Sequence, residues 1–351
     1  MVAAALQHAG FVLSGRACSP LAATRTKAPI PCALATFTFF PQHCAARPSL
    51  HFDKKPHQAL HSNFVPKFLA ASPAGQVTPA AGKGRAVTSM AVEPAVIVGY
   101  GRVGQALEKM GGEKDVVVKR GEKVPVDSTG PILIATRNDA LDRVIEGTPA
   151  DRREDLVFMQ NGMLEPYLAS KGLEAATQVL VYFAVAKAGD APMDGKTDVN
   201  PEGLTAATGK WAEAVAARLH SAGLSCKVLD TAAFRKSMLE KLIWISAFML
   251  VGVKNGNASV GDVEAKYRDE VAALIAELAA VAEKETGVTL DEGLEERLCA
   301  YARSVAHYPT AVKEFEWRNG WFFDLSKKTV DATGSDPCPL HTCWLRRVGA
   351  A

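Results

Sequence analysis

The stretch PAVIVGYGRVGQALEKM, residues 94–110, decides the fold. It begins with a short apolar, β-branched run, which is typical of a buried parallel strand, and it ends in a helical pattern. Between them, the spacing Gly-x-Gly-x-x-Gly gives a tight turn, a close backbone approach to a pyrophosphate and close packing of the helix on the strand. We therefore predict a dinucleotide site whose cofactor-binding loop consists of Gly99, Tyr100, Gly101, Arg102, Val103 and Gly104.

Strands and helices alternate after this loop. Further short apolar runs lie at residues 115–119, 131–136, 156–159 and 179–186. This alternation predicts an α/β fold with a doubly wound parallel sheet of the Rossmann type. From about residue 201 the pattern becomes helical, which predicts an all-helical C-terminal domain. The helical segments expected there are residues 202–220, 234–253, 262–286 and 292–307.

These patterns divide the chain into four parts. We expect a leader at residues 1–92, a dinucleotide-binding Rossmann domain at 93–230, a helical substrate-binding and catalytic domain at 231–330, and a turn-rich C-terminal tail at 331–351. The apolar helix at 238–253 is explained equally well by burial in a homodimer interface or in an interface between the domains.

The leader has the composition of an organelle transit peptide. It holds nine Lys or Arg but one acid, Asp53, and is rich in Ala, Ser, Thr and Pro. Its length favours the plastid stroma, with the mitochondrion second and a disordered regulatory tail as the alternative. We expect cleavage between about residues 85 and 91.

Charge and cysteine content exclude several classes of function for the mature part. Without residues 1–92, 31 Lys and Arg face 37 acids, so the formal net charge is −6 instead of +2. We therefore expect no nucleic-acid partner and no membrane partner. Cys338, His341 and Cys343 lie close together, but no second ligand pair with zinc-site spacing accompanies them. No metal site is predicted.

The residues after the second strand indicate which dinucleotide binds. An acid there would read the ribose hydroxyls of NAD, but this strand ends in Lys119-Arg120, while Asp115 lies at its start. Two cations at this place suit the 2′-phosphate of NADP(H), which is the predicted cofactor. A solvated charge pair in a loop is the alternative. Thr136, at the tip of the third strand, is a further predicted cofactor contact.

Four short stretches together resemble the ketopantoate reductase family, part of the Rossmann dehydrogenases with a helical, 6-phosphogluconate dehydrogenase C-terminal-like second domain. They are VGYGRVG at 98–104, QNGM at 160–163, LEKL at 239–242 and EFEWRNGWF at 314–322. The resemblance spans roughly residues 94–345. It implies that Asn161 lies beside the nicotinamide and substrate, that Lys241 is the catalytic lysine, and that Glu314 binds substrate. It also places Asn319-Gly320 at the family's Asn-Gly.

The chain departs from the family at two places. A lysine usually follows the third strand, but here Arg137 and Asn138 follow it, and we predict that they bind substrate. The family's catalytic helix also carries asparagines after the lysine, where this chain has Ile245 and Met249. The departures favour a substrate other than ketopantoate.

The chemistry of a reductase fits these residues. Adding hydride to a ketone leaves charge on oxygen, so a proton donor is needed. Lys241 has apolar neighbours that would lower its pKa and make it suitable. The alternative is a lysine that reaches out of a buried helix to pair with an acid such as Glu240.

Two classes of function follow. The first is an NADP-dependent oxidoreductase that reduces a small-molecule carbonyl substrate, a 2-keto acid or a similar compound, or runs the reverse reaction. A β-hydroxyacid or arogenate/prephenate-type dehydrogenase would keep this class and change the substrate. The second is a non-catalytic NAD(P)-binding sensor or scaffold on a decayed reductase fold.

Overall fold

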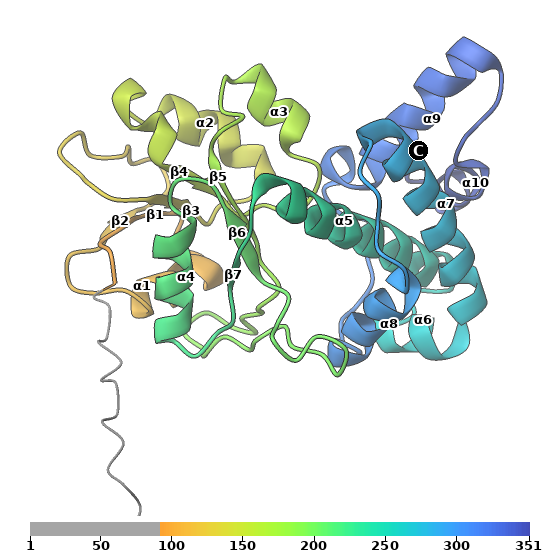
Figure 1. The fold of residues 1–351 in the computed structure, drawn as a ribbon, viewed down its shortest axis with the longest axis horizontal. Coiled ribbons are helices and arrows are strands. Elements are labelled where there is room, and N and C mark those ends of the chain that lie inside the picture. Colours follow the sequence, from red (N-terminus) through yellow and green to blue (C-terminus); the bar gives the residue numbers. More distant parts are fainter. Residues whose placement is uncertain (1–91) are drawn as a thin grey trace, which may run out of the picture. The chain divides into compact units, whose positions relative to one another are not determined.

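The computed structural model describes residues 92–351, in which a seven-stranded sheet joins a helical half (Figure 1). The transit segment predicted for residues 1–92 therefore lies outside the described residues, apart from Val92. The two halves share a core: Leu180, Tyr182 and Ala206, from the sheet and the loop after it, pack in one apolar cluster with the long helix α5.

The sheet has the strand order β2-β1-β3-β4-β5-β6-β7. Its strands are β1 Val96–Val98, β2 Val116–Val118, β3 Ile132–Ile134, β4 Leu156–Phe158, β5 Thr177–Leu180, β6 Ala206–Thr208 and β7 Lys227–Val228. Every neighbouring pair is parallel except β5 and β6, which are antiparallel. The predicted doubly wound sheet is confirmed, with two strands, β6 and β7, that run opposite to the other five. Because β2 and β3 lie on opposite sides of β1, the strand order reverses at β1, where a ligand crevice opens in such sheets.

Helices cover both faces of the sheet. Helices α1 (Arg102–Lys109) and α4 (Ala212–Ser221) pack on the face that includes Ile97, whereas α2 (Leu141–Glu146) and α3 (Glu165–Ser170) pack on the face that includes Val98. Successive strand residues point to opposite faces, so a strand covered on both sides must be apolar throughout. That requirement explains the continuous apolar runs in the sequence.

Helix α5, Thr231–Lys254, is the centre of the helical half. Asp230 caps its start by accepting a hydrogen bond of 2.8 Å from the Ala233 amide. Its apolar side chains are buried nearly all round because other helices surround it. These are α6 Val260–Lys266, α7 Arg268–Thr286, α8 Leu294–Ser304 and α10 Pro339–Arg347, and a further helix, α9 Asn319–Thr333, packs on α7 and α10.

Three expectations about the second half were wrong in detail. Residues 202–220 are not helical throughout, because Ala206–Thr208 forms β6 between β5 and β7. The expected helix 262–286 is interrupted at Tyr267, which divides it into α6 and α7. Residues 331–351 contain helix α10, whose Leu345 is fully buried, instead of only turns.

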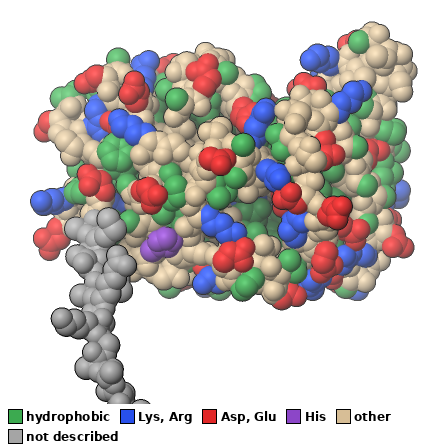
Figure 2. Space-filling view, viewed as in Figure 1, with side chains coloured by type: hydrophobic (Ala, Val, Ile, Leu, Met, Phe, Trp, Pro, Cys, Tyr) green, Lys and Arg blue, Asp and Glu red, His purple; other side chains and the backbone are tan. Residues whose placement is uncertain are grey.

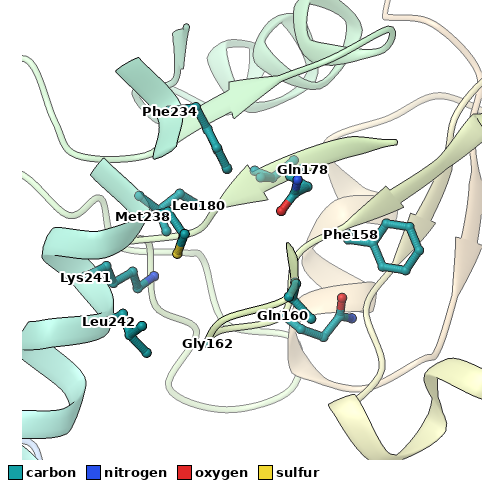
Figure 3. Close-up of a pocket in the computed structure, with 11 residues that line it drawn as sticks. Phe158, Gln160, Gly162, Gln178, Leu180, Phe234, Met238, Lys241 and Leu242 are labelled. Atoms are coloured by element: carbon teal, nitrogen blue, oxygen red, sulfur yellow. The ribbon is translucent and has the colours of Figure 1, made fainter. Parts of the chain in front are cut away.

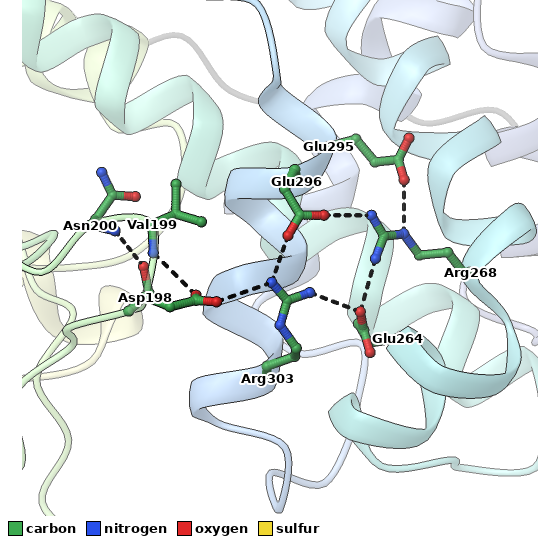
Figure 4. Close-up of polar contacts among 9 residues, drawn as sticks. Asp198, Val199, Asn200, Glu264, Arg268, Glu295, Glu296 and Arg303 are labelled. Carbon is green, nitrogen blue, oxygen red and sulfur yellow. Dashed lines mark hydrogen bonds and ion pairs between the residues drawn. The ribbon is translucent and has the colours of Figure 1, made fainter. Parts of the chain in front are cut away.

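A charge network joins the helices to the long loop between β5 and β6 (Figure 4). Arg268 and Arg303 both contact Glu264, at 2.8 and 3.0 Å, and both contact Glu296, at 2.9 and 2.6 Å. Arg303 also lies 3.7 Å from Asp198 of that loop. Because these side chains are partly exposed, each pair contributes little by itself.

The surface seen in Figure 2 carries acidic and basic side chains in a mixed pattern. Within residues 92–351, no helix combines the length and hydropathy needed to cross a bilayer. The same residues form no group of three or more His, Cys, Asp or Glu side chains placed to hold a metal ion.

Candidate active site

The glycine loop has the geometry that a pyrophosphate requires. Gly99 has φ +97°, and its amide donates to the Val118 carbonyl at 2.9 Å. A Cβ on Gly104 would lie 1.9 Å from the Gly99 oxygen, so this glycine lets α1 pack on the strand. A Cβ on Gly101 would meet nothing within 4 Å, and no side chain caps α1. The helix start thus faces open space, where its amides and dipole suit an anion.

The side chains of the loop are engaged elsewhere. The Tyr100 hydroxyl donates to Glu108 at 2.7 Å, and Arg102 donates to the carbonyl oxygens of residues 185 and 186 at 3.2 and 3.0 Å. Val103 packs against the sheet core. A bound cofactor would therefore meet the backbone of this loop more than its side chains.

A cavity of about 610 Å³ opens beyond the ends of β1, β2 and β3. Thr136 lies in its wall, and the Thr136 Oγ1 atom is buried without a hydrogen-bond partner among the described residues. Three acids line the cavity: Glu122, Asp139 and Glu146. Five cations line it too: Lys119, Arg120, Lys123, Arg137 and Arg143. The excess of cations suits a phosphorylated ligand.

Asp115 stabilises the fold and does not line this cavity. It lies at the start of β2, where its carboxylate accepts hydrogen bonds from Arg218 at 2.6 and 2.8 Å. Both side chains are 2% exposed. The buried pair ties α4 to the sheet at the edge opposite to the cavity, so it holds no ribose.

The strand tip at residues 160–162 joins the sheet to the helical half. The Gln160 amide donates to the carbonyl oxygens of Ile134 and Thr136 at 2.9 and 3.0 Å, which fixes the end of β4 to the end of β3. Asn138 is buried and donates to the Asn161 carbonyl at 3.3 Å. The Asn161 side chain is half-buried at this edge.

Gly162 is required for a reason that the sequence did not reveal. It has φ +116°, and a Cβ there would lie 2.3 Å from the Trp317 carbonyl oxygen. That oxygen accepts a hydrogen bond of 2.7 Å from the Met163 amide. The loop before α9 thus packs directly on the strand tip, and the glycine makes room for the loop.

Lys241 points from α5 toward this strand tip (Figure 3). It is 5% exposed and shares a small cavity of about 10 Å³ with Gln160 and Gly162. Its Nζ donates to the Val181 carbonyl and lies 4.3 Å from the centre of the Tyr182 ring. Burial, reinforced by the nearby Arg318 charge, lowers the pKa of Lys241 to about 7. Such an amine can gain or lose a proton near neutral pH.

The loop before α9 contains an ion pair, formed by Glu314 and Arg318. Glu314 has a left-handed backbone (φ 47°, ψ 51°), which is uncommon outside glycine and asparagine. Its carboxylate accepts a hydrogen bond from Arg318 Nη2. Burial lowers the pKa of Arg318. Sequence reasoning missed Arg318, although a cation within an aromatic run, EFEWRNGWF, was a signal of it.

The structure gathers part of the predicted site. Asn161, Lys241 and the loop bearing Glu314 meet at the carboxyl end of β4. Arg137 is not among them, because its side chain is 77% exposed and lines the larger cavity. Ile245 lies four residues after Lys241 on α5 and is buried. Met249, four residues further on, packs against the apolar core of the helical half. Asn319 is buried, and its Oδ1 atom lies 2.9 Å from His341 Nε2.

No protein-family model matches the sequence. A search of curated proteins finds no match by sequence either.

Solved structures with the same fold exist. A dimeric ketopantoate reductase from Staphylococcus aureus has a TM-score of 0.51 at 16% identity, over 74% of this chain and 98% of that chain. A PanE/ApbA family ketopantoate reductase from Ralstonia eutropha has 0.51 at 17%, over 73% and 97%. A D-mandelate dehydrogenase, with NADH and anilino(oxo)acetate, has 0.52 at 15%, over 73% and 97%. The resemblance is thereby confirmed for the fold.

Proposed function

We propose that this chain is an NADP-dependent oxidoreductase that reduces a 2-keto acid or a similar carbonyl, or runs the reverse reaction. One observation carries the proposal: a desolvated lysine, Lys241, lies at the carboxyl edge of a Rossmann sheet beside the Asn161 strand tip. Ligands bind at this edge in open α/β sheets. Burial of a lysine costs stability, and proton transfer is a role that needs the pKa near neutrality which this burial produces.

Each part of the proposed site has its own role in binding or in the reaction. The loop 99–104 would hold the pyrophosphate, and the nicotinamide, when bound, supplies the hydride. Lys241 gives a proton to the carbonyl oxygen, or takes it back in the reverse direction. Asn161 orients the reacting group, since its amide can both donate and accept. Glu314 binds a polar substrate group or keeps the neighbouring cation in place.

The preference for NADP rests on the larger cavity. Lys119 and Arg120 lie where the second strand ends, and three more cations line the same cavity. Asp115 pairs with Arg218 at the other end of this strand and does not reach the cavity. The D-mandelate dehydrogenase was solved with NADH, so the fold by itself does not choose between the two cofactors.

The class of substrate is supported by the neighbours and by the small cavity. Anilino(oxo)acetate, bound to the D-mandelate dehydrogenase, is a 2-oxo acid derivative, and two other neighbours are ketopantoate reductases. In this chain Ile245 and Met249 stand where the resemblance implies asparagines, and apolar side chains line the cavity at Lys241. These replacements favour a substrate other than ketopantoate.

Two further parts of the proposal concern the setting of the protein. The acid-poor, hydroxyl-rich segment 1–92 supports import into a plastid, with the mitochondrion second. A homodimer is proposed because the S. aureus neighbour is described as dimeric.

The first test is separate titration of residues 91–351 with NADPH and NADH, followed by fluorescence. Lys119→Ala and Arg120→Ala should each weaken NADPH binding by about tenfold or more, because each removes a charge-assisted contact to the 2′-phosphate. NADH binding should change little. Arg346→Ala, an exposed arginine on α10, is the control.

A carbonyl panel then tests turnover. NADPH oxidation that depends on one substrate class and is lost in Lys241→Ala would support the reductase. Tight nucleotide binding without turnover on any carbonyl would favour the sensor or scaffold. Failure to bind either nucleotide would refute both proposals.

A further inference from the structure

Arg318 is a buried cation that the roles assigned so far do not use. Its side chain is 14% exposed. Among the described residues, Glu314 is its one hydrogen-bond partner, through Nη2. The Nε atom is buried and has no partner. A guanidinium has five N–H donors, and in Arg318 the Nε–H is the one that is buried without an acceptor among the described residues.

The backbone around Arg318 fixes its place. The preceding residue, Trp317, accepts a hydrogen bond of 2.7 Å from the Met163 amide and fills the space beside Gly162. The Trp317 ring also packs edge-on against Tyr167, with the ring centres 5.0 Å apart. Gly162 lines the same cavity as Lys241. Arg318 is thus held at the catalytic edge by contacts from the sheet.

The charges at this edge do not balance. Lys241 is buried, the Arg318 side chain is 14% exposed, and among the described residues Glu314 is the one acid paired to either of them. A buried charge that is incompletely paired is costly, and Arg318 keeps donors without partners. An anionic ligand would supply the missing acceptor oxygens.

We propose that Arg318 holds the carboxylate of the substrate through the donors that Glu314 leaves free. The inference rests on the proposed reductase function and names the residue that selects an acid over an uncharged ketone. In a 2-keto acid the carboxylate is bonded to the carbonyl carbon. When Arg318 binds this carboxylate, the ketone oxygen of the same substrate therefore lies close to Lys241.

Arg137, the carboxylate partner expected from sequence, is the rival for this role. It is 77% exposed, lies 3.6 Å from Asp139, and lines the larger cavity with Lys119 and Arg120. A guanidinium in water binds a carboxylate weakly, whereas one in a desolvated site binds it strongly and selectively. The position of Arg318 is therefore the better one for selecting an acid.

The test is binding of oxamate, a stable analogue of a 2-keto acid, to the NADPH complex of the protein. Binding is followed by tryptophan fluorescence, since Trp317 adjoins Arg318. Arg318→Gln should raise the Kd of oxamate by about tenfold or more. It should leave the Kd of NADPH and of the uncharged ethyl oxamate unchanged. Arg346→Gln, which changes an exposed arginine of α10, is the matched control and should bind all three ligands as the unmodified chain does.

Two further variants guard against a purely structural effect. Arg318→Lys keeps the charge and removes the planar fork, so it should bind oxamate with an intermediate Kd. Glu314→Gln removes the carboxylate that holds Arg318 in place, so it should weaken oxamate binding, but less than Arg318→Gln does. A larger loss in Glu314→Gln than in Arg318→Gln would make Glu314 the residue that binds the substrate and would overturn the role of Arg318.

Failure of this inference can be told apart from failure of the reductase function. Unchanged oxamate affinity in Arg318→Gln, an equal loss for ethyl oxamate, or no oxamate binding by the unmodified protein would each overturn the role of Arg318. NADPH binding and reduction of an uncharged ketone would then leave the reductase standing. Oxamate binding without any affinity for NADPH would keep the anion site and remove the reductase.

Discussion

Replacing Lys241 by methionine should make the protein more stable and inactive. The native pKa of Lys241 is about 7, against 10.5 for a free lysine. Since a shift of one unit corresponds to about 1.36 kcal/mol, holding this amine in the folded protein costs about 4–5 kcal/mol at pH 7. Methionine is unbranched and similar in length, so it fills the same space without that cost. Loss of the contacts to Val181 and Tyr182 will reduce the gain.

The dependence of this gain on pH identifies its cause. Between pH 7 and 10.5 the unfolded chain binds a proton at residue 241 that the folded chain does not. The free energy of unfolding of the unmodified protein therefore rises with pH through this window. The advantage of Lys241→Met should fall from about 4 kcal/mol at pH 7 to about 2 kcal/mol at pH 9 and vanish above pH 10.5.

Urea denaturation at pH 7 and pH 9 measures both quantities. The control is Lys236→Met on the same helix, where a partly exposed lysine pairs with Asp291 at 2.7 Å. Its effect should be small and of similar size at both pH values. A Lys241→Met variant that is less stable at pH 7, or one whose gain is the same at pH 9, would refute the argument that Lys241 is desolvated.

Three other outcomes follow from single contacts. Gly101→Ala should keep the melting temperature and weaken NADPH binding. Gly104→Ala should lower the melting temperature, because its Cβ would collide with backbone. Thermal-shift measurements with and without NADPH distinguish the two effects. Burial lowers the pKa of His341 to about 4, so the unfolded state binds more protons between pH 6.5 and 4, and stability should fall by about 3 kcal/mol across that window; His341→Gln should flatten the fall in urea titrations. Asp115→Asn should cost about 3–5 kcal/mol in urea denaturation, since it leaves the Arg218 charge buried without its partner.

The features that the sequence predicted correctly are local ones. Each of the first four strands is a continuous apolar run, and in β1, β3 and β4 every residue is buried because both faces of the sheet are covered there. Helix α5 was predicted for the same reason, since a segment that is apolar nearly all round must be buried. The glycine loop was predictable because three glycines at fixed spacing have few other uses next to a strand.

The features that were missed depend on distant partners. Strand β6 consists of Ala206, Ala207 and Thr208, which have no strong preference for a strand, and pairing with β5 and β7 determines its conformation. Helix α10 follows a turn-rich segment, and its burial against α5 and α7 was not visible in the local pattern.

The same distinction applies to the site. Asn161, Lys241 and Glu314 came from short motifs, and the structure brings their elements together at one edge. Arg318 was overlooked because its burial depends on the contact between Trp317 and Gly162, which lie 155 positions apart in the chain. The same contact explains Gly162, which makes room for the loop before α9.

Two buried arginines show why the unpaired donors of Arg318 are informative. Arg218 is 1% exposed, and four hydrogen bonds satisfy it, to Asp115 and to the carbonyl oxygens of Leu107 and Glu93. This chain therefore satisfies both terminal nitrogens of a buried guanidinium where the fold alone requires it. Arg318 instead keeps a buried Nε without a partner, next to Glu314 in a strained left-handed conformation. Since local rules are broken mainly at sites under functional constraint, this edge of the sheet is where a ligand is expected to complete the charges.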